Sequence, residues 1–237
     1  MFTAPQPMTT VPWMIDGTAL FTDTLAGLTD AQLAEPSTLP GWSRAHVVGH
    51  LGLNAQALGN LVEWARTGEP HSMYASAQQR DADIEASSGW PAATLRRFVA
   101  DTAADLDTAL DGLDADSWHR EVVNAQGAPI PASGIPWMRT REVYLHAIDL
   151  AGAASFADLP DDFCAALVAD VVARRAGRES GPALRLEATD GHCWEIGNPA
   201  VAVLVRGNVA GLAQWLSGRG TAGLPGAVDL PELDRWL

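Results

Sequence analysis

SRAHVVGHLGLNAQALGNLVEWAR, residues 43–66, is the stretch that decides the fold. Ser43 is suited to cap a helix, and Gly68 and Pro70 close the segment, so we predict one helix over residues 44–66. Its apolar residues recur every three or four positions, which is typical of a helix with one face on a core. They are Val47, Leu51, Ala55, Leu58, Val62 and Ala65.

Three further segments show a similar spacing of apolar residues and are bounded by Pro or Gly. We predict helices over residues 13–28, 91–112 and 137–151. The polar stretch 71–88 is interpreted as a loop or weak helix, and the Pro- and Gly-rich stretch 125–136 as irregular. Four helices with facing apolar stripes indicate a bundle.

The last third of the chain mixes short strand-like runs with helices. The dipeptide Asp190-Gly191 between apolar runs is typical of a hairpin, and Asn208 is suited to cap a final helix. We therefore predict an α+β protein, in which residues 1–155 form a four-helix bundle and residues 156–237 a smaller domain. Its predicted elements are a helix at 161–175, strands at 184–188, 193–196 and 201–205, and a helix from 208 to 217.

Charge excludes several function classes. The 237 residues include 29 Asp and Glu against 15 basic residues, all of them Arg, which gives a net charge of −14. Such a chain repels nucleic acid and anionic membrane surfaces, and the absence of Lys excludes Schiff-base and P-loop chemistry. We find no leader peptide and no apolar run of ~18 residues, and we expect a cytoplasmic monomer. Cys164 and Cys193 are expected to be reduced thiols.

The histidines suggest a metal site. Glu142 and His146 are four residues apart on a predicted helix and so project from one face. His46 and His50 show the same spacing on the helix at 44–66. One of these two with the first pair gives two imidazoles and a carboxylate, a ligand set suited to zinc with an open fourth position. The alternative is an ordinary ion pair on a solvated helix face.

The positions of the two histidines favour His50 as the ligand. His50 follows the apolar Val47 by three residues and so turns toward the interior, where an unpartnered imidazole is costly. His46 is predicted to be a surface or supporting residue. Asp149 lies three residues after His146 and is placed to hold its second ring nitrogen, with a plain helical aspartate as the alternative.

Several motifs resemble the DinB-like, maleylpyruvate isomerase family. The longest are GWSRAHVVGH at residues 41–50 and WMRTREVYLHAIDL at residues 137–150. The resemblance spans nearly the whole chain, because shorter matching stretches lie at residues 73–74, 124–127, 131–133, 218–220 and 235–237. It implies that the chain is an enzyme that uses zinc and mycothiol to isomerise maleylpyruvate to fumarylpyruvate in gentisate degradation.

The resemblance also implies particular residue roles. His50, Glu142 and His146 correspond to the family's zinc ligands, and Arg219 corresponds to its catalytic arginine. Arg219 lies between two glycines just after a predicted helix, and a guanidinium can grip a carboxylate bidentately. Without the resemblance, a cation favoured by the end of a helix is the simpler interpretation.

Some assignments stay open at this point. Arg80 and Arg139 are candidates for contacts with an anionic substrate or with the low-molecular-weight thiol, although arginines on the surface of an acidic protein are common. The substrate is expected to be a small dicarboxylate. Two alternatives share the site: a mycothiol S-transferase that acts on another electrophile, and a non-catalytic metal-binding module.

Overall fold

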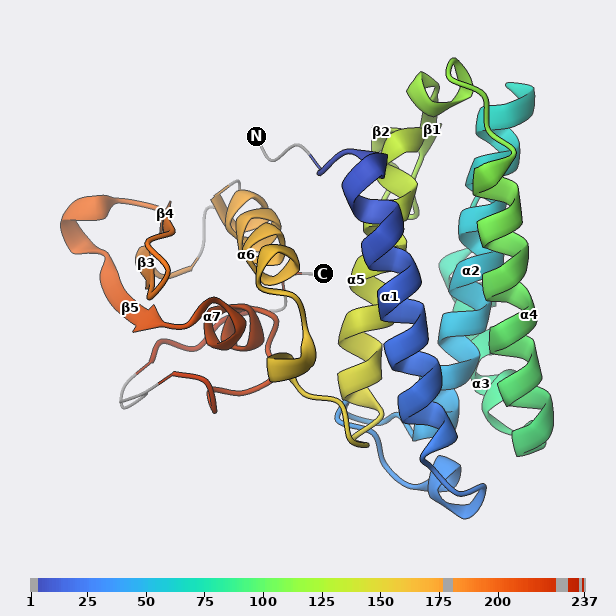
Figure 1. Cartoon of the computed structure of the whole chain (residues 1–237), viewed down its shortest axis with the longest axis horizontal. Helices are drawn as coiled ribbons and strands as arrows, with labels where there is room; N and C mark the ends of the chain where they lie inside the picture. Colours follow the sequence, from blue (N-terminus) through green and yellow to red (C-terminus); the bar gives the residue numbers. More distant parts are fainter. Residues whose placement is uncertain (1–3, 177–180, 225–229, 235, 237) are drawn as a thin grey trace. The chain divides into compact units, whose positions relative to one another are not determined.

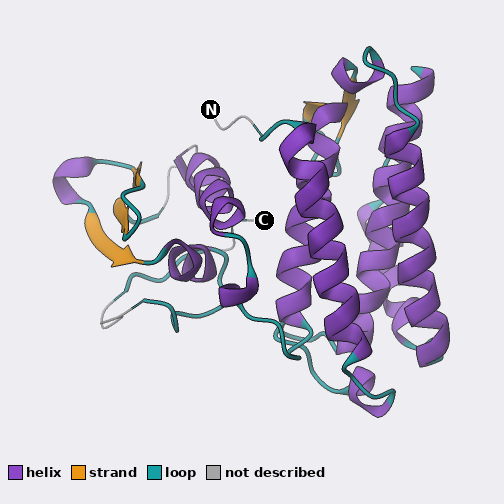
Figure 2. Ribbon diagram, viewed as in Figure 1, coloured by secondary structure: helices purple, strands orange, loops and turns teal. Residues whose placement is uncertain are grey.

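The computed structural model describes residues 4–176, 181–224, 230–234 and 236. The chain divides into two compact units, one of residues 5–154 and one that begins at residue 155. The predicted α+β class is confirmed, since helices dominate the described residues and the strands form two small sheets (Figure 2). Within the described ranges, no helix combines the length and the apolar character needed to span a bilayer.

The first unit contains the predicted four-helix bundle. In it α1 packs beside α5 and α2 beside α4, and α2 also contacts α5 (Figure 1). Apolar faces at helical spacing explain this pairing, because each helix buries one stripe against its neighbours. The helices are α1 (Pro7–Ala26), α2 (Arg44–Thr67), α4 (Ala92–Asp111) and α5 (Ile135–Asp149).

The ends of α2 follow the sequence prediction. The Ser43 side chain accepts a hydrogen bond from the backbone N–H of His46, and Gly68 ends the helix in the left-handed conformation with φ of 81°. In contrast, α1 begins at Pro7, six residues before the predicted start. Proline is favoured in the first helical turn because it has no N–H to satisfy there.

The polar stretch before α4 corrects one prediction. Residues 77–88 form a regular helix, α3 (Ala77–Ser88), rather than a loop or weak helix. The Ser76 side chain caps it by accepting from the N–H of Gln79, and Ser87 is buried. The close packing depends on Gly49 of α2, because a Cβ atom there would collide with the Ser87 hydroxyl.

The Pro- and Gly-rich stretch is also more regular than predicted. Strands β1 (Glu121–Val123) and β2 (Pro129–Pro131) form an antiparallel pair, with Val122 opposite Ile130. Gly127 supplies the turn with φ of 76°. Both members of a two-stranded sheet are edge strands, which tolerate proline.

The bundle core consists of two apolar clusters. One contains Leu58, Leu61, Leu106 and Ile135, and the other contains Phe21, Val47, Leu51, Leu95 and Val143. On α2 the change from one cluster to the other falls between residues 51 and 55, and on α5 between residues 135 and 143. Asn54, Arg139 and Glu142 lie within these intervals, so a polar layer interrupts the apolar core next to His50.

The second unit packs two helices with a three-stranded sheet in the order β4-β3-β5. Strands β3 and β4 form the predicted hairpin at Asp190-Gly191, whereas β3 and β5 are parallel. The Asn208 side chain caps the last helix, as predicted, by accepting from Gly211 N–H. The elements are α6 (Asp161–Ala176), β3 (Leu184–Ala188), β4 (Cys193–Ile196), β5 (Val203–Gly207) and α7 (Val209–Leu216). Arg235 and Leu237 of the closing motif lie outside the described residues.

Candidate metal centre

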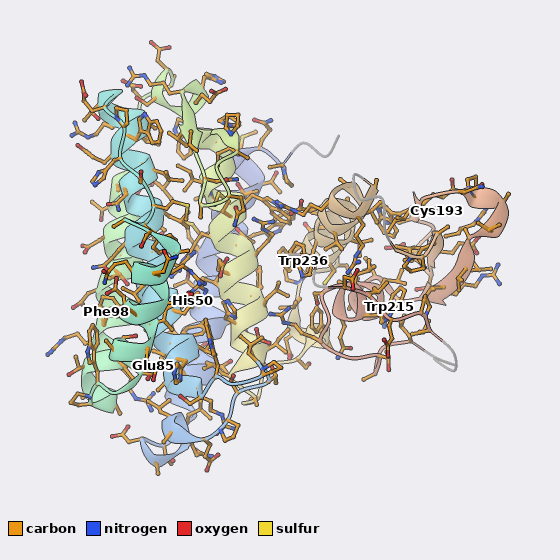
Figure 3. The ribbon with its side chains drawn as sticks, turned by 180° about the vertical axis from the view of Figure 1, so that it is seen from behind. His50, Glu85, Phe98, Cys193, Trp215 and Trp236 are labelled. Carbon is orange, nitrogen blue, oxygen red and sulfur yellow. The ribbon has the colours of Figure 1, made fainter. Side chains whose placement is uncertain are left out.

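The structure brings His50, Glu142 and His146 together inside the bundle. His50 projects from α2, where Figure 3 labels it, and the other two project from successive turns of α5. The Nε2 atoms of His50 and His146 lie 3.0 and 3.1 Å from the same atom, Glu142 Oε2. One ligand atom from each residue lies within 4.8 Å of the others, as a shared metal ion requires.

Hydrogen bonding fixes which nitrogen of His146 faces the cluster. Its Nδ1 lies 2.9 Å from Asp149 Oδ2, and this fully buried carboxylate also accepts from the Thr38 hydroxyl at 2.6 Å. A carboxylate partner places the proton on Nδ1 and leaves a lone pair on Nε2. That lone pair points at a carboxylate oxygen, so the cluster requires a proton or a metal cation between them.

The electrostatics of the cluster favour an ionised carboxylate. Burial by itself raises the pKa of Glu142, but hydrogen bonds and charge from His146 and His50 outweigh burial and hold this pKa well below its ordinary value. Burial lowers the pKa of His50, which favours the neutral imidazole that metals bind. Glu142 is therefore ionised at neutral pH, which is the form that a metal ion binds.

The donor set and its exposure fit a catalytic rather than a structural metal. Two imidazole nitrogens and one carboxylate oxygen form a three-residue ligand set that leaves a fourth position for water or substrate. The Glu142 side chain keeps 26% of its surface exposed, whereas His50 keeps 6%. The cluster thus reaches solvent through Glu142.

Asp149 provides a direct test of the support around His146. Replacing Asp149 with Asn is expected to weaken metal affinity about 10–100-fold, because the amide no longer fixes the tautomer and orientation of the ring. Competition with a chromophoric chelator measures this affinity. The exposed Asp101→Asn is the matched control, and unchanged affinity in Asp149→Asn would show that His146 needs no such support.

His46 is not part of the cluster. Its Nδ1 lies 2.7 Å from the Ser43 hydroxyl at the start of α2, and its Nε2 lies 3.1 Å from a carboxylate oxygen of Glu85 on α3. Trp42 stacks on the His46 ring and contacts the His50 ring edge-on, with centroids 5.4 Å apart in the second case. His46 therefore has the predicted supporting position and joins α2 to α3.

Arg139 is buried in the core, whereas a side chain that contacts an anionic substrate or a thiol was expected to be accessible. Its side chain is 1% exposed, and Nη1 donates to the Leu51 carbonyl at 2.7 Å and to Asn54 Oδ1 at 2.9 Å. Burial lowers the pKa of Arg139 to about 10, although the charge of Glu142 opposes this shift. The guanidinium joins α5 to α2 within the core.

Removal of Arg139 should therefore affect stability. Arg139→Ala is expected to lower the free energy of unfolding by about 3–5 kcal/mol, because it leaves a cavity and breaks a buried polar network. Urea denaturation measures the change. Arg97→Ala, on the exposed face of α4, should change stability by less than about 0.5 kcal/mol. Equal effects of the two substitutions would contradict the structural role.

Arg80 and Arg219 remain candidates for contacts with the substrate or the thiol. Arg80 is half-buried on α3 and pairs with Asp81 at 2.8 Å. Arg219 follows α7, between Gly218 and Gly220 with φ of 78° and 99°, and its Nη1 donates to the Ser217 carbonyl at 2.9 Å. Both glycines adopt left-handed conformations, so the backbone on either side of Arg219 requires residues without a Cβ.

Three residues near the metal cluster escaped the sequence analysis. Thr38 acts through Asp149 and lies 111 residues away from it in the chain, a contact that no local pattern indicates. Asn54 was detectable, because it follows His50 by four residues and so shares its face of α2. Tyr74 was quoted only as part of a motif, and its position beside the cluster was not expected.

This fold and this cluster define a four-helix bundle with a candidate metal site. The sequence model of the mycothiol maleylpyruvate isomerase N-terminal domain matches residues 16–151. Two crystal structures, of the mycothiol-dependent maleylpyruvate isomerase and of a histidine-to-alanine variant of it, are 32% identical to the chain with a TM-score of 0.93. They cover 99% of this chain and 100% of their own.

The chain therefore belongs to the mycothiol maleylpyruvate isomerase family of enzymes. YfiT from Bacillus subtilis, described as a probable metal-dependent hydrolase with an unusual four-helix bundle topology, is a more distant structural neighbour. Its identity is 15% and its TM-score 0.51, over 64% of this chain and 89% of its own, so the likeness concerns the fold alone. No curated protein matches the chain.

Proposed function

We propose that this protein is a zinc- and mycothiol-dependent cis–trans isomerase that converts maleylpyruvate to fumarylpyruvate. The convergence of His50 Nε2, His146 Nε2 and Glu142 Oε2 carries the proposal, because it offers a divalent metal three ligands and leaves a position for a thiol. Family membership and the 32% identical crystal structure support the substrate and the thiol. Dependence on a reduced thiol fits a cytoplasmic location.

The reaction needs temporary loss of double-bond character. A thiol supplies a nucleophile whose reversible addition to the alkene leaves a single bond that can rotate before elimination. A bound zinc ion supplies the positive charge that favours the thiolate form of such a thiol at neutral pH. The remaining tasks belong to the side chains of this protein.

The side chains of the site have separate tasks in this proposal. Glu142 stays ionised and contributes negative charge to the metal site, and Asp149 keeps Nε2 of His146 directed at it. Arg219 binds a carboxylate of the substrate or the enolate charge that develops after addition. The buried thiol of Cys164 does not replace mycothiol, because burial raises its pKa to about 12 and the thiol is protonated at neutral pH.

Spectroscopic measurement of maleylpyruvate turnover tests the proposal. Zinc-loaded protein is expected to produce fumarylpyruvate only with mycothiol, and a chelator is expected to abolish the reaction. Absence of turnover with one metal ion bound per chain would overturn the isomerase assignment. Formation of a stable mycothiol conjugate with another electrophile would then identify an S-transferase, and an inert metal complex would identify a non-catalytic module.

A further inference from the structure

One of the two negative charges of the proposed substrate has no partner among the residues discussed so far. The substrate is a dicarboxylate, and Arg219 accounts for one of its two negative charges. Glu142 and a thiolate would together offset the charge of a divalent ion, so the metal site does not neutralise the second carboxylate. The chain as a whole carries a net charge of −14, which makes a specific cationic partner more necessary.

Most arginines of the bundle are engaged elsewhere. Four of them donate to main-chain carbonyl groups and so hold helices or loops together: Arg44, Arg96, Arg120 and Arg139. Arg66 pairs with Glu63 through two hydrogen bonds on the surface of α2. Arg80 differs, because its only ion pair among the described residues is with the adjacent Asp81, which is 70% exposed. Exposed pairs of this kind contribute little and are easily exchanged for another anion.

Arg80 also lies on the correct face of α3. It precedes the buried Ile84 and Ser87 by four and seven residues, so all three share the face that packs on α2. Ser87 packs against Gly49, the residue before His50. Arg80 and Tyr74 line a hollow together with Leu53, which lies one helical turn beyond His50 on α2. Asp83 of α3 also lines this hollow, and its side chain accepts a hydrogen bond from Gln79 at 2.8 Å. The guanidinium lies 5.8 Å from the centre of the Tyr74 ring.

Tyr74 contributes a neutral phenol to this hollow. Burial raises the pKa of Tyr74, and the charge of Glu142 raises it further, whereas Arg80 opposes both effects. Tyr74 stays protonated at neutral pH and remains a hydrogen-bond donor.

We propose that Arg80, backed by Tyr74, binds the second carboxylate of the substrate in this hollow, one helical turn along α2 from His50. This inference rests on the proposed function and extends it, because it explains how a dianion is accepted by an acidic protein. Arg80 offers a planar fork that matches a carboxylate, and Tyr74 offers a neutral hydroxyl beside it. Arg80 is thus a specificity-determining residue that acts on the part of the substrate remote from the double bond.

The test compares Arg80→Gln with the control Arg66→Gln. Arg80→Gln is expected to raise KM for maleylpyruvate at least tenfold and to change kcat less than threefold, whereas Arg66→Gln should change neither. Calorimetric titration of zinc-loaded protein with the cis-dicarboxylate maleate, in the absence of mycothiol so that no thiol can add to its double bond, provides a readout independent of turnover. Maleate affinity is expected to fall about tenfold in Arg80→Gln, and Arg80→Lys is expected to restore part of it.

The outcomes separate this inference from the proposed function. If wild-type protein isomerises maleylpyruvate but Arg80→Gln keeps wild-type KM and maleate affinity, the role of Arg80 is wrong and the isomerase assignment stands. If wild-type protein shows no turnover but binds maleate in a manner that depends on Arg80, the dicarboxylate site stands without the isomerase. An equal loss of maleate affinity in Arg66→Gln would reduce the effect to overall charge and would overturn the inference.

Discussion

Glu142→Gln is expected to eliminate both tight metal binding and mycothiol-dependent isomerisation. The substitution keeps the volume and one acceptor oxygen but removes the only negative charge among the three ligands. Disturbing a supporting residue of a metal site already costs about 10–100-fold in affinity, so loss of an anionic ligand should cost more than about 100-fold. Metal content after gel filtration and turnover with saturating mycothiol measure the two effects.

The structure offers a matched control for this experiment. Glu85 pairs with His46 on the exposed side of α3, so Glu85→Gln also removes one carboxylate from one imidazole. It should leave metal content and turnover within about twofold of the wild type. If Glu142→Gln retains one tightly bound metal ion per chain, the three side chains do not form the metal site. If it loses the metal but keeps full activity, the proposed role of the metal is wrong.

The helices of the bundle could be predicted from the sequence where the periodicity of apolar residues was strong. The stripe from Val47 to Ala65 and the capping residue Ser43 were sufficient to define α2, and the spacing of Glu142 and His146 placed both on one face of α5. Periodicity failed at α3, because few of its residues are apolar and its helical state depends on Ser76 and on packing over Gly49. Such tertiary contacts have no local signature.

Arg139 shows how the available signal can be misinterpreted. Its charge suggested a surface position, but it precedes Glu142 by three residues and His146 by seven, so the helical period places all three on one face. The period was the more reliable guide, because the guanidinium finds hydrogen-bond acceptors on another helix, the Leu51 carbonyl and Asn54 Oδ1. Those partners become visible only when α2 and α5 are packed together.

Arg219→Ala is the second substitution with a large expected effect. Removing a cationic group that binds charge developing in the transition state costs about 10²–10³-fold, or about 3–4 kcal/mol, and we expect that loss in kcat/KM for maleylpyruvate. Because metal ligation does not involve Arg219, metal content should stay at the wild-type level. Steady-state kinetics together with metal analysis of the same preparation measure both quantities.

Two further measurements distinguish a role of Arg219 in binding the substrate from a structural role. Arg219→Lys keeps the charge but loses the planar fork, so it should recover only part of the activity if the carboxylate is bound bidentately. An uncharged electrophile should react with mycothiol equally well in wild type and Arg219→Ala, because it has no carboxylate for the arginine to bind. Equal losses with the charged and the uncharged substrate would show that Arg219 does not bind a substrate carboxylate. Its role would then be to stabilise the enolate charge or to support the structure around α7, where it bonds to the Ser217 carbonyl. A loss confined to the dicarboxylate would establish that the arginine after α7 selects the substrate, while the bundle supplies the metal ligands.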